Sequence, residues 1–171
     1  MFSAITFDEI SGLYVPAFWA LMNSKKRQLY DSVFSNLKSL VSNEMKTEIF
    51  YGDFETANLL SIEKNFPGSQ IKCCYFHLLQ AWWRTANKMG LKQNNVKFFT
   101  RIVIENFKIA VHIKEKTMRS KFLNNVNKVI FEENKLKLDE FQMKQLKQFY
   151  KSVMRTYFDD HSYFSKFINH R

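Results

Sequence analysis

The sequence has few of the residues that crosslink, break or anchor a chain. Its only cysteines are the neighbours Cys73 and Cys74, which cannot form an ordinary disulfide framework. Four glycines and two prolines leave few turns. The N-terminus lacks the basic region, apolar run and small-residue cleavage site of a secretory signal. No apolar stretch approaches the roughly 20 residues of a membrane-spanning helix, so we expect an intracellular protein with no membrane partner.

Common catalytic motifs are also missing. The sequence has no G-x-S-x-G, no P-loop and no H-E-x-x-H, so it offers no recognisable hydrolase nucleophile, nucleotide cradle or helical zinc pair. It is rich in apolar and aromatic residues instead, with 46% hydrophobic residues and 18 Phe among its 171 residues. A chain of this length and composition is expected to bury a substantial core.

Positive charge is concentrated in the second half of the chain. Residues 1–90 hold 9 Lys and Arg against 8 Asp and Glu, whereas residues 91–171 hold 17 against 8, and the net charge is +10. The excess predicts attraction to an acidic partner, with DNA as the leading candidate. The alternative is an ordinary solvated, lysine-rich surface in a protein from an A/T-rich genome.

Residues 1–90 alternate short apolar runs with segments of helical periodicity. The apolar runs predict strands at 2–7, 15–22, 47–52 and 71–76. The first two of these strands are predicted to form a hairpin whose turn contains Gly12. Helices are predicted from near Ser24, from Glu55, and after the last run up to a cap at Gly90. This alternation predicts an α/β fold in which residues 1–90 build one sheet-based layer.

Residues 91–171 show helical stripes and no strand pattern, so we predict a basic helical region there. The clearest stripe lies near residues 141–157 and comprises Leu146, Phe149, Tyr150, Val153 and Tyr157. At 100° per residue, the opposite face of this helix carries four cations, namely Lys144, Lys147, Lys151 and Arg155. These cations are candidates for non-sequence-specific DNA binding, although they could equally be solvated surface charges.

Two short patterns are candidates for chemistry. Asp53 follows a predicted buried strand, and carboxylates at strand ends of an α/β sheet often bind ligands or metal ions. The simpler interpretation is that Asp53 caps the helix that begins near Glu55. Cys74 and His77 form a C-x2-H pattern, but a structural zinc site needs about four ligands. We therefore expect a packed cysteine beside a hydrogen-bonded histidine that supports the sheet.

Three segments together resemble the Mutator-like element (MULE) transposases. Residues 15–22 (VPAFWALM), a lysine-containing loop and Tyr30 resemble V-P-x-x-Y-A-L-L…K…Y. Residues 52–57 (GDFETA) are similar to T-D-F-E-x-A. Residues 66–84 resemble F-P-x-A-x-I…G-C-x-F-H-x-x-Q-A-x-W-R, including Cys74 and His77. The order and spacing over residues 1–91 make the resemblance specific, whereas the helical half resembles the family only in pattern.

The resemblance implies an RNase H-like fold in which a D-D-E triad holds two Mg²⁺ ions for DNA transposition in the nucleus. Such chemistry needs several converging carboxylates. Asp53 corresponds to the second acid. The first acid of the family precedes the hairpin and the third follows the helical region, so we expect a domain truncated at both ends and lacking its first strand. Asp8 is a weak substitute for the first acid, because its spacing to Pro16 leaves no room for the family's extra strand.

These expectations lead to two main hypotheses. In the first, the chain is a transposase fragment that is catalytically inactive alone, binds no Mg²⁺ tightly, and is retained for DNA or protein binding. In the second, a partner chain or missing exons complete an active metal-dependent enzyme. A structural remnant without function is the third. Loss of the first strand would leave unpaired sheet edges, which predicts a homo-oligomer or a protein partner.

Overall fold

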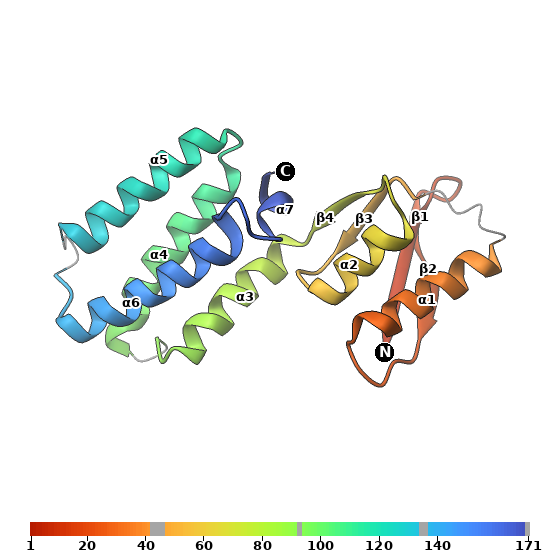
Figure 1. The fold of residues 1–171 in the computed structure, drawn as a ribbon, viewed down its shortest axis with the longest axis horizontal. Coiled ribbons are helices and arrows are strands. Elements are labelled where there is room, and N and C mark those ends of the chain that lie inside the picture. The colour runs from red at the N-terminus through yellow and green to blue at the C-terminus, as the bar shows by residue number, and fades with distance from the viewer. Residues whose placement is uncertain (42–46, 92–93, 134–136, 170–171) are drawn as a thin grey trace. The chain divides into compact units, whose positions relative to one another are not determined.

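The computed structural model describes residues 1–41, 47–91, 94–133 and 137–169. Its contacts divide the chain into two compact units, Met1–Ile71 and Lys72–Arg171 (Figure 1). The first unit carries strands and two helices, and the second is helical. An α/β fold is therefore confirmed for the chain. No helix among the described residues is long and apolar enough to span a membrane.

The first unit begins with the predicted hairpin. Strands β1 (Phe2–Asp8) and β2 (Leu13–Ala20) pair in antiparallel fashion. The turn between them uses Gly12 at a φ of +69°, a backbone conformation that glycine adopts without a steric penalty. The register contains a bulge, because Ala4 faces Phe18 whereas Ile5 faces Pro16. One residue of β2 is thus extra, which increases the local twist of the hairpin.

The remaining strands form a second, smaller sheet. Helix α1 (Arg27–Leu40) precedes β3 (Ile49–Gly52), and helix α2 (Thr56–Asn65) precedes β4 (Gln70–Cys73). Strand β3 pairs with β4, while β1 and β2 pair with each other. The expectation of one sheet-based layer was therefore wrong, since among the described residues the strands form two separate two-stranded sheets.

The core of the first unit is aromatic. It is built from Tyr30 and Phe34 of α1 with Ile62 and Phe66 at α2, and Phe2 and Phe18 of the hairpin pack against it. Phe2 contacts Phe34 edge-on, with 5.9 Å between ring centroids. Edge-to-face packing of this kind adds to the free energy gained by burying the rings. Helix α1, rather than another strand, thus covers the inner face of the hairpin.

The pair α1–α2 is also joined by a polar network around Asp31. The Asp31 carboxylate accepts hydrogen bonds from the Ser61 hydroxyl at 2.6 Å and from Lys64 Nζ at 2.9 Å. These donors, with the Lys64 bond as the largest cause, hold the pKa of Asp31 below its usual range. The hydroxyl of Ser61 is buried, so it needs such a partner inside the protein.

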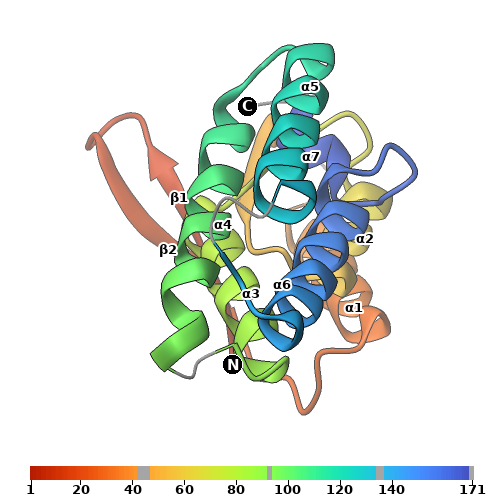
Figure 2. The same ribbon diagram turned by 90° about the vertical axis from the view of Figure 1, so that its left-hand side faces the viewer.

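The second unit begins near the end of β4 and is helical thereafter, as predicted. Its elements are α3 (Tyr75–Lys88), α4 (Asn94–His112), α5 (Lys116–Asn127), the π-helical turn η1 (Lys128–Glu132), α6 (Glu140–Val153), the π-helical turn η2 (Met154–Phe158) and α7 (Ser165–Asn169). Helices α4, α5 and α6 lie side by side, and α3 contacts α6 (Figure 2). The contact boundary falls after residue 71, so α3 packs with the later helices, although the sequence assigns it to a domain 1–90.

The predicted strand at 71–76 is shorter than expected. Strand β4 ends at Cys73, and Tyr75 and Phe76 already belong to α3. The aromatic run has high β propensity, but the buried stripe of Leu78, Trp82 and Ala86 continues the helical period back to it. Helix α3 ends as predicted, with Gly90 at a φ of +77° after the last turn.

Candidate functional site

Asp53 lies where the sequence predicts it, directly after strand β3. The strand ends at Gly52, and the exposed Asp53 follows in the loop to α2. The N-cap position of α2 is Glu55, whose side chain makes no capping hydrogen bond. The N-cap position of α2, which the simpler interpretation gives to Asp53, is therefore occupied by Glu55.

Glu55 is the residue of this loop that binds side chains from the start of α1 and from the segment before it. One oxygen of its carboxylate accepts a hydrogen bond from the Tyr30 hydroxyl at 2.7 Å, and the other accepts one from Lys25 Nζ at 2.8 Å. Tyr30 is buried, whereas the Lys25 side chain is 80% exposed. Two segments that are about 25 residues apart in the sequence therefore meet at one carboxylate.

The Tyr30 phenol is influenced by both acidic residues of this loop. Burial raises the pKa of Tyr30 well above its usual range, and the hydrogen bond from the phenol to Glu55 raises this pKa further. The negative charge of Asp53 contributes in the same direction. Asp53 and Glu55 are two carboxylates, two positions apart in the sequence, at the start of α2.

Sequence reasoning assigned no role to Lys25, Tyr30 or Glu55. All three lie inside the segments that carry the family resemblance. Their side chains can form hydrogen bonds with one another, but the sequence does not show that they meet.

Asp8 has a local role in the hairpin. Its carboxylate accepts hydrogen bonds from the backbone N–H groups of Ile10 and Ser11 and from the Ser11 hydroxyl. The Ser11 side chain is the main cause that lowers the pKa of Asp8. Asp8 therefore holds the β1–β2 turn.

Cys74 and His77 belong to the second unit, at the start of helix α3. Cys74 is the N-cap residue, and His77 lies in the first turn, where its ring is 5.7 Å from that of Phe76 between centroids. Cys73 precedes them, buried in β4, and neither cysteine belongs to a disulfide. Among the described residues, no three His, Cys, Asp or Glu side chains are grouped so that they could hold a metal ion.

The four predicted cations share one exposed face in the second unit. Lys144, Lys147 and Lys151 lie on α6, and Arg155 lies on η2. All four are exposed, while their opposite face, including Leu146, Phe149 and Val153, is buried. Within the described part of the chain, none of the four forms an ion pair. Their charges are consequently available to an external anion.

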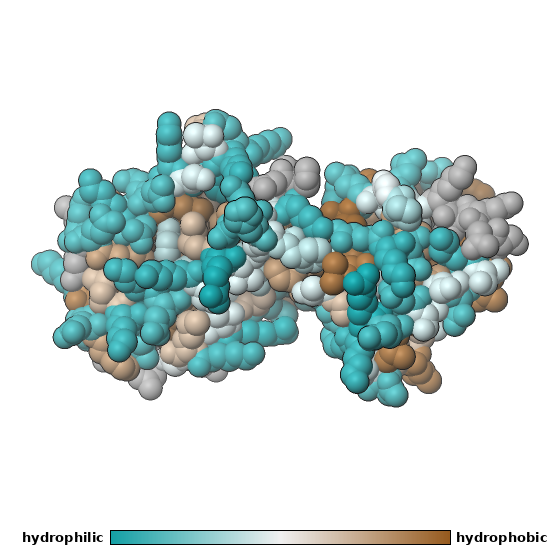
Figure 3. Space-filling model, viewed as in Figure 1, coloured by the Kyte–Doolittle hydropathy of each residue, from teal (hydrophilic) through white to brown (hydrophobic). Residues whose placement is uncertain are grey.

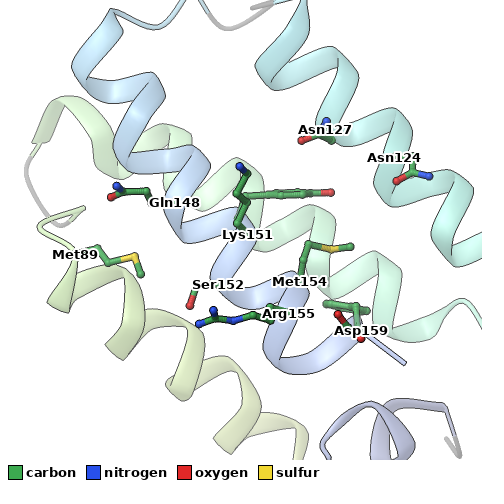
Figure 4. Close-up of a pocket in the computed structure, with 11 residues that line it drawn as sticks. Met89, Asn124, Asn127, Gln148, Lys151, Ser152, Met154, Arg155 and Asp159 are labelled. Atoms are coloured by element: carbon green, nitrogen blue, oxygen red, sulfur yellow. The ribbon is translucent and has the colours of Figure 1, made fainter. Parts of the chain in front are cut away.

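A groove of about 870 Å³ runs beside this basic face. Lys151 and Arg155 line it together with Gln148 and Ser152. Asn124 and Asn127 of α5 and Met89 at the end of α3 complete much of the lining (Figure 4). The groove also contains one carboxylate, that of Asp159. Hydrophilic residues cover most of the visible face of the helical unit (Figure 3).

The groove has an apolar part, lined by Met89, Tyr150, Met154 and Phe158, and a polar part that combines two kinds of group. The cations can neutralise anionic oxygens, and the amide side chains can both donate and accept hydrogen bonds. Arg155 presents a planar fork that fits the oxygens of a phosphate. The arrangement is thus suited to a phosphate-containing polymer that lies along α6.

The first half of the chain matches a known protein family. Residues 1–81 match the family model described as the MULE transposase domain. This match confirms the resemblance that the motifs of this half indicate, and it covers the hairpin, Asp53 and the C-x2-H pattern. No curated protein and no solved structure matches the chain.

Proposed function

We propose that the chain is a transposase-derived protein that binds DNA and does not cut it alone. The proposal starts from the match of residues 1–81 to the MULE transposase domain model. The proposed fold of its first part is a partial RNase H-like sheet, and its proposed location is the nucleus. The observation that carries the proposed DNA-binding function is the exposed basic face of α6 and η2, formed by Lys144, Lys147, Lys151 and Arg155.

The donor set of the first unit supports the proposal that the chain does not cleave DNA by itself. In the family, several carboxylates hold two Mg²⁺ ions, and the metals bind both the attacking and the leaving oxygen. Here Asp53 matches the second acid of the triad, and both oxygens of the nearby Glu55 are engaged by Tyr30 and Lys25. The described residues around Asp53 therefore do not fit a two-metal centre without carboxylates from elsewhere.

The basic face supports DNA as the partner for three reasons. Lys144, Lys147, Lys151 and Arg155 follow one helical line, so they can contact successive phosphates. Their chain carries a net charge of +10, which attracts a polyanion over a distance. Contacts to phosphates carry no direct base information, so the proposed binding is not sequence-specific.

A fourfold glutamine variant tests DNA binding. Replacement of Lys144, Lys147, Lys151 and Arg155 by Gln should weaken binding to a labelled duplex and reduce the slope of log K against log salt by about three to four units. The control replaces four other exposed cations of the second unit, Arg84, Lys97, Arg101 and Lys114. It removes the same charge away from the groove and should preserve most of the slope. Equal slopes for wild type and the first variant would refute the basic face as the DNA site.

A metal titration tests the absence of cleavage. The isolated chain should not nick or join supercoiled DNA in Mg²⁺ or Mn²⁺, because one matched acid cannot hold two metal ions. Metal-dependent cleavage that Asp53→Asn abolishes would instead favour an active enzyme completed by a partner chain or by further segments. The same variant leaves the basic face intact, so DNA binding serves as its folding control.

A further inference from the structure

Part of the groove beside the basic face lies between helix α5 and the end of α6. Asn124 and Asn127 project from α5, and Lys151 and Met154 lie across from them on α6 and η2 (Figure 4). These residues all belong to the second unit, so this part of the groove is formed within one compact part of the chain. The whole groove has a volume of about 870 Å³, within the range of about 300–1,000 Å³ of pockets that bury small organic groups.

The bottom of the groove is aromatic and rigid. Tyr150 lines the groove and reaches from α6 to α5, where its hydroxyl donates a hydrogen bond to the Leu123 carbonyl at 2.7 Å. Its ring stacks on Phe107 of α4, with 5.0 Å between ring centroids. Phe158 also lines the groove and stacks on Phe107 at 5.6 Å. Because their neighbours already fix these rings, a flat partner that packs against them costs the protein little ordering entropy.

Neutral amide side chains lie beside this aromatic part. Asn124 is exposed, and within the described ranges of the chain its side chain forms no hydrogen bond. The amide nitrogen of Asn127 donates to Glu132 at 3.2 Å, which leaves the amide oxygen to accept a further hydrogen bond. An amide offers both donors and acceptors, so these two asparagines can pair with the polar edge of a nucleobase.

Both signs of charge are present in the groove. Lys151 carries a positive charge, and Asp159, directly after η2, carries a negative one. The Asp159 carboxylate accepts a hydrogen bond from the backbone N–H of His161 at 2.9 Å, which holds it in place. A carboxylate repels a phosphate but accepts a hydrogen bond from the exocyclic amino group of a base. The groove therefore favours a ligand with an anionic end and a neutral, amino-bearing end over a simple anion.

A nucleotide has all of these features. Its base is flat, the edge of the base carries donors and acceptors, and its phosphate is anionic. In a paired duplex the faces of the bases are stacked and their edges are paired, so a base enters such a groove only when it leaves the duplex. The line of cations continues from Lys151 through Lys147 to Lys144, about 10 Å along α6, and can hold the phosphates of the adjoining strand.

We propose that the groove between α5 and α6 binds one unpaired nucleotide of a DNA strand whose backbone lies along the basic face. The proposal rests on the proposed DNA-binding function and adds to it a preference for DNA that contains an unpaired base. The base packs against the aromatic bottom of the groove and Met154, while Asn124 and Asn127 pair with its edge. Lys151 holds the phosphate of the same nucleotide.

Three labelled duplexes of one sequence test this preference by fluorescence anisotropy at a single salt concentration. The first is fully paired, the second has one extra, unpaired adenosine, and the third has the same extra position without its base. The second and third share the flexible break in the duplex, so they differ only in the base. The whole chain should bind the second about tenfold more tightly than the other two. Equal affinities for the second and third would overturn the proposal, because flexibility would then explain any preference.

A neutral double variant tests whether the base lies in the groove. Asn124→Ala with Met154→Ala should reduce the preference to about threefold or less, and the salt dependence should stay the same because no charge is removed. The control is Asn125→Ala with Met118→Ala, which changes one amide and one methionine of α5 that do not line the groove. It should keep the full preference. Asn124→Ala alone, at an exposed position, should reduce the preference by about twofold or more.

The outcomes separate this proposal from the proposed function. Unchanged affinity of the double variant for the fully paired duplex shows that it is folded, and if that affinity falls, Asn124→Ala alone decides. A preference that survives in the groove variants, or that the control loses equally, would overturn the proposal. Failure to bind any of the three duplexes would refute the DNA-binding function itself, whereas equal binding of all three would refute this inference alone.

Discussion

The hydrogen bond between Tyr30 and Glu55 should contribute measurably to the stability of the first unit. The donor oxygen lies 2.7 Å from the carboxylate, and Tyr30 is 4% exposed. A hydrogen bond to a charged group contributes about 1.5–3 kcal/mol when its surroundings are dry. The Glu55 side chain is 24% exposed, so we expect the lower end of that range, about 1.5 kcal/mol.

A double-mutant cycle isolates this contribution. Tyr30→Phe should cost about 1 kcal/mol, because the carboxylate that remains can be rehydrated at the surface. Glu55→Ala should cost about 2 kcal/mol, since it leaves a buried hydroxyl without an acceptor. The double variant should cost clearly less than the sum, with a coupling of about 1–1.5 kcal/mol. Glu55→Gln retains an acceptor oxygen and should recover part of the loss.

Lys25 provides the internal control for the cycle. Its Nζ lies 2.8 Å from the other oxygen of Glu55, but the side chain is 80% exposed. Exposed ion pairs contribute between zero and about 1 kcal/mol, so Lys25→Ala should change stability by less than about 0.5 kcal/mol. Hydrogen exchange of α1 and α2 measures the opening free energy of this unit separately from the second. A coupling near zero, or a Lys25→Ala cost equal to that of Glu55→Ala, would refute the reasoning.

Three further outcomes follow from other contacts. Asp31 has a lowered pKa in the folded state, so its contribution to stability is present above its unfolded pKa of about 3.9 and is lost as the pH falls. In the Asp31→Asn variant, the free energy of unfolding from urea denaturation should therefore fall less steeply as the pH is lowered from about 6 to 2. Trp82→Ala should destabilise the second unit by about 3–5 kcal/mol, because the ring is fully buried and packs on Phe107 at 5.5 Å, and thermal unfolding that is unchanged would contradict this. Purified protein should contain no stoichiometric zinc, and zinc that is lost in Cys74→Ser would show that the C-x2-H pattern holds a metal.

Elements with strong local signals were predictable from the sequence. The hairpin follows from two apolar runs around Gly12. Helix α6 and the turn η2 after it follow from five apolar residues at helical spacing, all of which are buried. The end of β4 was misplaced because aromatic residues such as Tyr75 and Phe76 favour strands locally, whereas tertiary packing of α3 decides their conformation. The division into two small sheets also depends on tertiary pairing, which a single sequence does not encode in any short window.

The candidate sites show the same contrast. The exposed line of Lys144, Lys147, Lys151 and Arg155 could be predicted because helical periodicity alone fixes it. The convergence of Lys25 and Tyr30 on Glu55 could not, because it depends on the packing of α1 against the start of α2. The groove was unpredictable for the same reason, since its lining comes from three helical segments of the second unit.

Two neighbouring thiols mark the point where one contact unit gives way to the next. Cys73 is 4% exposed at the end of β4, while Cys74 is half-buried at the start of α3. A thiol reagent reaches the buried sulfur only when its strand opens, whereas the neighbour reacts without a comparable opening. The ratio of the two labelling rates therefore measures how often β4 opens locally. Both sulfurs lie in almost the same stretch of chain, so each serves as the reference for the other. A mutation, a salt or a bound DNA that loosens β4 therefore changes the ratio of the two labelling rates.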